Sequence, residues 1–265
     1  MGVAVVADNR VGAGDNMGLC IVAKALPDGY TIAVTTPAIA LSPSLYANLG
    51  HDAQKDLTPT ARLAAIENVV LVHPDVPAKN LRDCVELARN QPGKLTYVSG
   101  GPSTTNHLAN ELLKSLEKID MLHVPYKGAT VAAVALMGAG VDEVIVSVAS
   151  SLPYIRTGKV RPLAVLSQKR VAALPDVPTA LESGVPGFTM SIWYGMLAPG
   201  RMPKELVTRL NQEAVKALGA ADLRKSFATQ GVDPWPGTPA EFDALIKSET
   251  ARYAKIIERA GLKKE

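Results

Sequence analysis

Short apolar runs rich in Val, Ile and Leu alternate with helical patterns along most of this 265-residue chain. Runs of this kind predict buried strands, and their alternation with helices is typical of βαβ units in a largely parallel sheet. The pattern therefore predicts an α/β fold. The predicted strands are residues 3–7, 31–35, 69–72, 95–98, 121–124, 142–146, 161–166 and 193–197, and the predicted helices are residues 16–24, 81–90, 105–116, 129–137, 204–218, 221–229 and 239–260.

The C-terminal helical pattern carries a complete start signal. Thr238 stands at the N-cap, Pro239 at the first helical position and Glu241 at the third. This is the arrangement of a capping box, in which the two side chains satisfy backbone N–H groups reciprocally. The motif predicts where the last helix begins, and it has no bearing on chemistry.

Two pairs of prolines divide the chain. Pro74 and Pro77 follow one apolar strand pattern, and Pro199 and Pro203 follow another. We interpret these places as crossings between two lobes, since a chain of this length can form two domains of ordinary size. The predicted first lobe comprises residues 1–73 and 198–265, and the second lobe, residues 74–197, is inserted in it.

Composition excludes several classes of protein. The 28 basic and 25 acidic residues give a net charge of +3, which is too balanced for a nucleic-acid-binding surface. No run approaches the ~18 consecutive apolar residues of a membrane span. Cys20 and Cys84 are predicted to be buried thiols, because neither has a Cys or His partner at metal-ligand spacing. We predict no metal, no cofactor and no catalytic residue.

The segment from residue 98 to residue 109 is the most informative in the chain. A predicted strand ends there in Ser99, Gly100 and Gly101, and an apolar helix begins after Thr104 and Thr105. Glycines allow a ligand to approach the backbone closely, and the first N–H groups of a helix, together with its dipole, attract anions. The turn is predicted to bind a carboxylate or a phosphate.

Two alternative readings of nearby motifs are less favourable. Residues 11–18 superficially resemble a dinucleotide fingerprint, but three residues separate the strand from the glycines, and the only acid near the expected spacing, Asp28, lies in a turn. His107 could serve as a general base, yet no nucleophile and orienting acid accompany it locally. We interpret His107 as structural and the glycine-rich segment as a loop at the edge of a ligand site.

Other strand ends supply further candidates. Lys127 follows the strand at residues 121–124, and Ser147 follows the strand at residues 142–146. If these strands are parallel, their carboxyl ends share one edge with the turn at Ser99. Lys127 is more simply an exposed lysine, since Lys is mostly exposed. Thr36 and Ala38, after the strand at residues 31–35, are the matching candidates in the first lobe.

Taken together and in order, these segments resemble the periplasmic solute receptors of the tripartite tricarboxylate transporter family, also called Bug receptors. The resemblance runs through nearly the whole chain. It is carried by Asp8-Asn9-Arg10, Gly12-Ala13-Gly14, Pro27-Asp28-Gly29-Tyr30-Thr31, residues 99–108, His123-Val124-Pro125-Tyr126-Lys127-Gly128, Gly158-Lys159-Val160-Arg161-Pro162-Leu163-Ala164-Val165, Leu174-Pro175-Asp176-Val177-Pro178-Thr179, Trp193-Tyr194-Gly195 and Leu197-Ala198-Pro199.

The resemblance implies a fold, a function and a set of contacts. It implies a two-lobed periplasmic-binding-protein (Venus flytrap) fold, type II-like, with one lobe inserted in the other. The lobes are expected to close on a small organic acid, which is then delivered to the membrane permease subunits of the transporter. The ligand-binding residues that it implies are Thr36, Ala38, Ser99, Gly100, Thr104, Thr105 and Ser147.

The sequence departs from the family pattern at several positions. Val146 stands where the family usually has Asp, and Val98, Ser103 and Asp15 stand where it usually has Gly. Losing Asp at Val146 is expected to remove a partner for a ligand amino group. The family pattern also has a strand, a glycine-rich turn, a helix and a signal peptide ahead of Asp8 that these 265 residues do not show. The expectations are a periplasmic location by resemblance, and self-association through an uncovered strand edge.

Three other functions remain open on sequence alone. A ligand sensor in signalling can use the same two lobes, because a fold does not determine function. An enzyme acting on an acyl or carbonyl substrate is disfavoured by the lack of a recognisable catalytic group of residues. A form with impaired binding would follow if the first lobe is incomplete.

Overall fold

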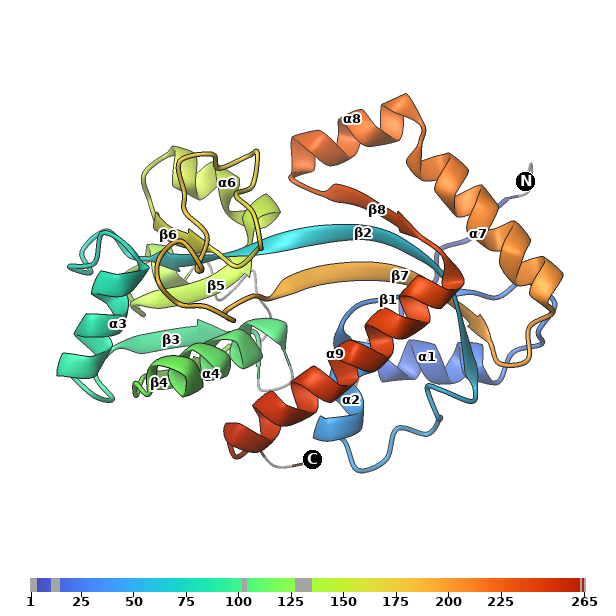
Figure 1. Cartoon of the computed structure of the whole chain (residues 1–265), viewed down its shortest axis with the longest axis horizontal. Helices are drawn as coiled ribbons and strands as arrows, with labels where there is room; N and C mark the ends of the chain where they lie inside the picture. The colour runs from blue at the N-terminus through green and yellow to red at the C-terminus, as the bar shows by residue number, and fades with distance from the viewer. Residues whose placement is uncertain (1–3, 11–14, 102–103, 127–134, 263, 265) are drawn as a thin grey trace. The chain divides into compact units, whose positions relative to one another are not determined.

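The computed structural model describes residues 4–10, 15–101, 104–126, 135–262 and 264 (Figure 1). The chain divides into two compact units: unit 1 is Met1–Ala65 with Trp193–Glu265, and unit 2 is Ile66–Ile192. Unit 2 is inserted in unit 1, which is the predicted nesting. The crossings lie at 65/66 and 192/193, whereas the proline pairs predicted 73/74 and 197/198.

The crossings fall inside two long strands. β2 (Leu57–Val72) and β7 (Ser191–Pro199) each begin in one unit and end in the other. Pro74 and Pro199 mark the places where these strands end, because proline cannot donate to a ladder. Proline spacing therefore locates strand ends, and the change of unit occurs several residues earlier.

Unit 1 has an antiparallel sheet with helices packed on it. β1 (Ala33–Thr35) pairs with β7, and β2 pairs with β8 (Asp233–Gly237). Gly195 of β7 leaves room for the Phe242 ring, which meets Trp193 edge to face at 5.6 Å between centroids. The helices are α1 (Asn16–Ala23), α2 (Ala38–Leu45), α7 (Lys204–Leu218), α8 (Ala221–Gln230) and α9 (Pro239–Arg259), and α2 packs against α9.

One part of unit 1 exposes large apolar side chains. Val34 on β1 is 61% exposed, and Met17 and Ile21 on α1 are about half exposed. The strand predicted at residues 3–7 does not form over its described part, residues 4–7, and Val5 and Val6 are almost fully exposed there. That prediction is wrong, because an apolar run becomes a strand only when a neighbouring strand pairs with it.

Unit 2 contains a mixed sheet. β3 (Thr96–Ser99) is parallel to β4 (Leu122–Pro125) and to β5 (Glu143–Ser147), whereas β2 is antiparallel to β5 and to β6 (Arg161–Val165). The helices of this unit are α3 (Leu81–Asn90), α4 (Thr105–Glu117) and α6 (Val148–Arg156). The prediction of a largely parallel sheet is therefore wrong outside β3, β4 and β5. Hydrophobic periodicity reports the burial of a strand and says nothing about its direction.

The two faces of the unit 2 sheet differ in polarity. Val98, Val144 and Val146 point into an apolar cluster with residues of α6. Since successive side chains alternate between faces, Tyr97, Ser99 and Glu143 share the opposite face. α4 packs on β3 and β5 (Figure 1).

The remaining differences from prediction also involve proline. All the predicted helices form within two residues of their expected ends except residues 129–137, which lie mostly outside the described residues. The capping box is confirmed: Glu241 N donates to Thr238 Oγ1 at 3.2 Å, and Thr238 N donates to Glu241 Oε2 at 2.7 Å. The elements missed were α2, α6, β8 and the first half of β2. Pro43 and Pro153 lie inside the two missed helices, and Pro234 and Pro236 inside β8. No helix in the described ranges is long and apolar enough to cross a bilayer.

Glu143 is a fully buried acid in the middle of unit 2. Neither carboxyl oxygen has a hydrogen-bond partner among the described residues. Burial raises the pKa of the Glu143 carboxyl well above its ordinary value, and the nearby Asn110 amide opposes this more weakly. At a pH above the ordinary pKa of a glutamate, Glu143 therefore keeps its proton in the folded protein, whereas the unfolded chain releases it.

We predict that stability falls as pH rises above the ordinary pKa of a glutamate, by at most about 1.4 kcal/mol per pH unit from this group. Glu143→Gln, which is neutral at every pH, should flatten that part of the profile. Urea unfolding at several values between about pH 5.5 and pH 8 measures it. The exposed Glu86→Gln on α3 is the control and should leave the slope unchanged; a Glu143→Gln profile as steep as that of the parent would refute the assignment.

Candidate functional site

The turn between β3 and α4 is built around two glycines. β3 ends at Ser99, and Gly101 has a φ of 126°, a conformation that side chains with a Cβ rarely adopt. Thr104 is the N-cap of α4, with φ −98° and ψ 152°, but its side chain does not cap the helix. Instead, Thr104 Oγ1 donates to Gly101 O at 2.6 Å. The threonine thus holds the turn closed and leaves the helix terminus to another acceptor.

Donors at the start of α4 remain available to a ligand. The first helical hydrogen bond runs from Leu108 N to Thr104 O, so the N–H groups of Thr105 and Asn106 precede the helical series. Thr105 is partly exposed, and its hydroxyl makes no hydrogen bond to any other described residue. The sequence prediction of an anion-binding terminus remains a prediction, and this geometry is consistent with it.

Ser99 lies beneath the turn and is fully buried. Its Oγ accepts the Gly101 N–H at 3.1 Å and lies 2.7 Å from His123 Nε2. The Ser99 hydroxyl is therefore engaged inside the protein. Gly100 is partly exposed, and its N–H points to Asn106 Oδ1 at 3.5 Å.

A stack of rings supports Ser99 from below. The rings of Tyr97, His107 and His123 are close and nearly parallel: the His123 centroid is 4.8 Å from that of Tyr97 and 4.3 Å from that of His107, and those two are 6.3 Å apart. Tyr97 donates to Glu111 Oε1 at 2.6 Å, and Lys114 Nζ lies 2.9 Å from the same oxygen. These contacts join the end of β3 to the middle of α4.

Burial of His123 favours its neutral form. Burial, with smaller contributions from the neighbouring His107 and Lys114 and against the opposing effect of Glu111, lowers the pKa of His123 to about 4. A neutral imidazole carries one N–H and one bare nitrogen. His123 Nε2 can therefore accept a hydrogen bond from the Ser99 hydroxyl at physiological pH.

Sequence reasoning missed His123 as a site residue. In the sequence, His123 appears only as the first residue of the motif at residues 123–128. A signal was present in strand alternation: His123 pairs in register with Tyr97, two residues before Ser99, and so shares its face. Only the pairing of β3 with β4 reveals this, because Ser99 and His123 are 24 positions apart in the chain.

Ser147 lies at the same edge of the unit 2 sheet as the turn. β3 and β5 are parallel, so their carboxyl ends share that edge. Ser147 is the N-cap of α6, and its Oγ accepts the Ser150 N–H at 3.2 Å and donates to Ser150 Oγ at 2.8 Å. The neighbouring candidate Lys127 lies outside the described residues.

Thr36 and Ala38 belong to unit 1. Thr36 Oγ1 donates to Asp15 Oδ2 at 2.9 Å, and the Ala38 N–H donates to Thr36 Oγ1 at 3.3 Å. Asp15 has a φ of 70°, a left-handed conformation that favours glycine. The Thr36 hydroxyl, which is the side-chain donor of this turn, is thus already bonded to the Asp15 carboxylate. The glycines of residues 11–14 lie outside the described residues.

Val146 stands where the sequence departs from the family's usual Asp. Its side chain is buried in the apolar cluster with Val69 and Val165, on the sheet face opposite Ser99. An Asp at this position would point into that cluster, away from the α4 turn. That an Asp here would partner a ligand amino group stays a prediction.

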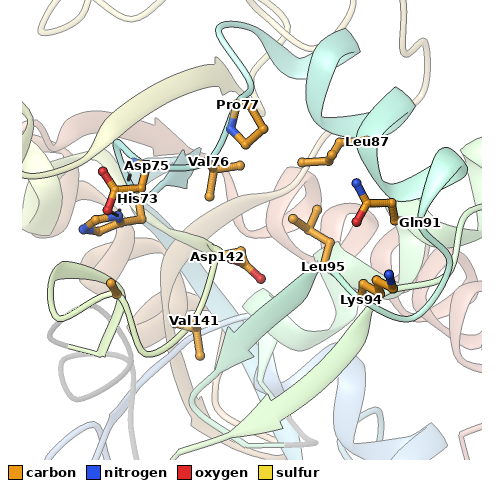
Figure 2. A pocket seen from close by; sticks show the side chains of 11 residues that line it. His73, Asp75, Val76, Pro77, Leu87, Gln91, Lys94, Leu95, Val141 and Asp142 are labelled. Atoms are coloured by element: carbon orange, nitrogen blue, oxygen red, sulfur yellow. Dashed lines mark hydrogen bonds and ion pairs between the residues drawn. The ribbon is translucent and has the colours of Figure 1, made fainter.

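A measurable pocket of about 340 Å³ lies at the other end of the unit 2 strands (Figure 2). Leu95 and Asp142, which precede β3 and β5, line it. His73 and Asp75 lie together on one side, with Gln91 and Lys94 on the other (Figure 2). Asp142 accepts the N–H and Oγ1–H of Thr96 at 2.8 and 2.7 Å, so it stabilises the start of β3. The lining sets Asp75 and Asp142 against His73 and Lys94, so it has no excess of basic groups to attract a carboxylate.

The thiols and acids show no arrangement for metal binding. Within the described ranges, no group of three or more His, Cys, Asp or Glu residues is placed to hold a metal ion. Cys84 is buried as predicted, whereas Cys20 is only partly buried and its Sγ donates to Leu49 O at 3.0 Å.

Known proteins show a consistent likeness. A family profile described as "Tripartite tricarboxylate transporter family receptor" matches residues 1–262. A Pseudomonas sp. protein from a tcbD-tcbE intergenic region is 36% identical over 97% of this chain and 77% of its own length. The Bordetella pertussis protein BugT is 30% identical over 99% of this chain and 81% of its own length.

Solved structures agree in fold. R. palustris Rpa4515 with adipate is 32% identical, with a TM-score of 0.88 over 98% of this chain and 87% of that one. MatC from Rhodopseudomonas palustris with bound malate is 30% identical, with a TM-score of 0.81 over 93% of this chain and 85% of that one. The α/β fold in two units, the turn at the start of α4 and the match along almost the whole chain lead to one conclusion: this chain belongs to the receptor family of the tripartite tricarboxylate transporters.

Proposed function

We propose that this chain is a periplasmic receptor that binds a small organic acid and delivers it to a transporter permease. The observation that carries the proposal is the glycine turn ahead of α4, where the N–H groups of Thr105 and Asn106 and the Thr105 hydroxyl make no hydrogen bond to other described residues. Charge-assisted bonds from such donors to a carboxylate are roughly twice as strong as neutral ones. We propose a binding role and no catalysis.

The ligand class follows from the donors and from relatives. The solved relatives hold adipate and malate. We propose a dicarboxylate, or an aromatic or small monocarboxylate, with one carboxylate at residues 99–105. Glu111 is bonded to Tyr97 and Lys114, and Glu143 is fully buried. Neither acid is available to a ligand ammonium group at the turn, and a desolvated ammonium without a counter-charge is strongly disfavoured.

Thermal-shift screening tests the ligand class. We expect succinate, glutarate, adipate or malate to raise the melting temperature, because ligands that bind only the folded state stabilise it. Aspartate and glutamate should give smaller shifts at the same concentration. Stabilisation by the two amino acids alone would contradict the proposed class, and no shift with any organic acid would contradict carboxylate binding.

Thr105→Ala tests the turn directly. We expect the variant to bind the best acid of that screen ~1–3 kcal/mol more weakly, because a hydroxyl donor to a charged group is lost. Isothermal titration calorimetry measures the difference. Thr105→Ser keeps the hydroxyl and should restore affinity, and Thr157→Ala, an exposed threonine elsewhere in unit 2, should have no effect. Equal affinities for Thr105→Ala and the parent would remove Thr105 from the site.

We also propose that the 265-residue chain self-associates through unit 1. The apolar side chains of β1 and α1 that face solvent, including Val34, Met17 and Ile21, form a surface that proteins normally cover. Light scattering over a range of concentrations should show dimers or larger species. Val34→Lys on β1 should shift the protein toward monomer, whereas Val215→Lys on α7 should not. A monodisperse parent monomer would overturn this proposal.

A further inference from the structure

We propose that His123 is a positioning residue for carboxylate binding, which acts through the Ser99 hydroxyl on the Gly100–Gly101 turn. This inference rests on the proposed function of the turn. It adds a residue that does not face the ligand. The juxtaposition that supports it is a fully buried serine held between an imidazole nitrogen and a backbone N–H of the turn.

The distances around Ser99 favour one arrangement of its hydrogen bonds. Ser99 Oγ accepts the Gly101 N–H at 3.1 Å, and the single hydroxyl proton must then go to another acceptor. Two acceptors lie within reach: His123 Nε2 at 2.7 Å and Gly101 O at 3.3 Å. The shorter contact is to the neutral imidazole. Ser99 thereby connects the Gly101 N–H to His123.

The second acceptor is already occupied. Gly101 O takes the Thr104 hydroxyl at 2.6 Å and also the Thr104 N–H at 3.2 Å. Without His123 Nε2, the Ser99 proton would have to compete for this carbonyl, which has two lone pairs. The competition would loosen Gly101, whose φ of 126° depends on these contacts. The amide groups of the turn would then be less well ordered for an incoming carboxylate.

The imidazole itself packs against two other rings. Tyr97 and His107 stack on it, and Tyr97 is fixed by its short bond to Glu111. The hydrogen bond to Ser99 and the packing of the ring are therefore separable contributions. A phenyl ring at position 123 retains the packing and removes the nitrogen, while a glutamine places an amide near the position of Nε2.

Calorimetric titration with succinate, adipate and malate, each used singly, tests the inference. We expect His123→Phe to bind the best of these acids roughly five- to tenfold more weakly than the parent, as for the loss of one hydrogen bond. His123→Gln should return to within about twofold, because the amide can restore the hydrogen bond. His73→Phe, at the opposite end of the unit 2 strands, is the matched control and should bind like the parent.

A double-mutant cycle tests whether His123 acts through Ser99. We expect Ser99→Ala combined with His123→Phe to bind no more weakly than Ser99→Ala alone, since both changes remove the same link. Amide hydrogen exchange at Gly101 should be faster in ligand-free His123→Phe than in the parent, and near the parental rate in His123→Gln. Melting temperatures identify any variant that has lost its fold.

The outcomes separate the two proposals. A parent that binds none of the three acids overturns the proposed function. A parent that binds, with His123→Phe within twofold of it, overturns the positioning role alone. Strictly additive effects of Ser99→Ala and His123→Phe, or a His123→Gln variant as weak as His123→Phe, would also overturn it, because ring packing would then account for the effect.

Discussion

The placement of α4 over the end of β3 is the constraint on which the candidate site depends. An anion-binding helix terminus is useful only if the helix cannot shift relative to the strand that leads into it. In unit 2 this is achieved by contacts within a buried layer: Tyr97 bonds to Glu111 of α4, and His123 stacks on Tyr97 and on His107 of α4. Such buried networks are stabilising only when their members are satisfied. The Tyr97–Glu111 bond and the stacking of His123 on His107 cross from sheet to helix, so the network determines position as well as stability.

The same layer contains groups with opposite responses to burial. Desolvation lowers the pKa of His123 and raises the pKa of Glu143, and both shifts favour the neutral form. The sheet face below α4 is therefore polar but uncharged at these two positions. A ligand carboxylate at the helix terminus would meet dipoles and N–H groups and no buried anion at Glu143. This is compatible with binding by backbone groups, as at other helix termini.

The turn in unit 1 differs from the turn in unit 2. Thr36 donates to the chain's own Asp15, whereas the Thr105 hydroxyl has no partner among the described residues. The two turns were matching candidates in sequence, since each places Thr shortly after a predicted strand. Their difference depends on Asp15, 21 residues from Thr36, and on its left-handed backbone. Equivalent local motifs can therefore differ in available chemistry because of one distant side chain.

The sequence by itself determined most helix positions, the glycine turn before α4 and the family. These depend on local signals: the capping box at Thr238, the periodicity of α3 and α7, and the motif order along the chain. Tertiary structure decided strand direction, the crossings inside β2 and β7, and the burial of Ser99 against His123. It also decided that Val146 points away from the turn and that residues 4–7 form no strand. The physical reason is that these outcomes depend on pairing and packing between residues far apart in the chain, about which a local pattern carries no information.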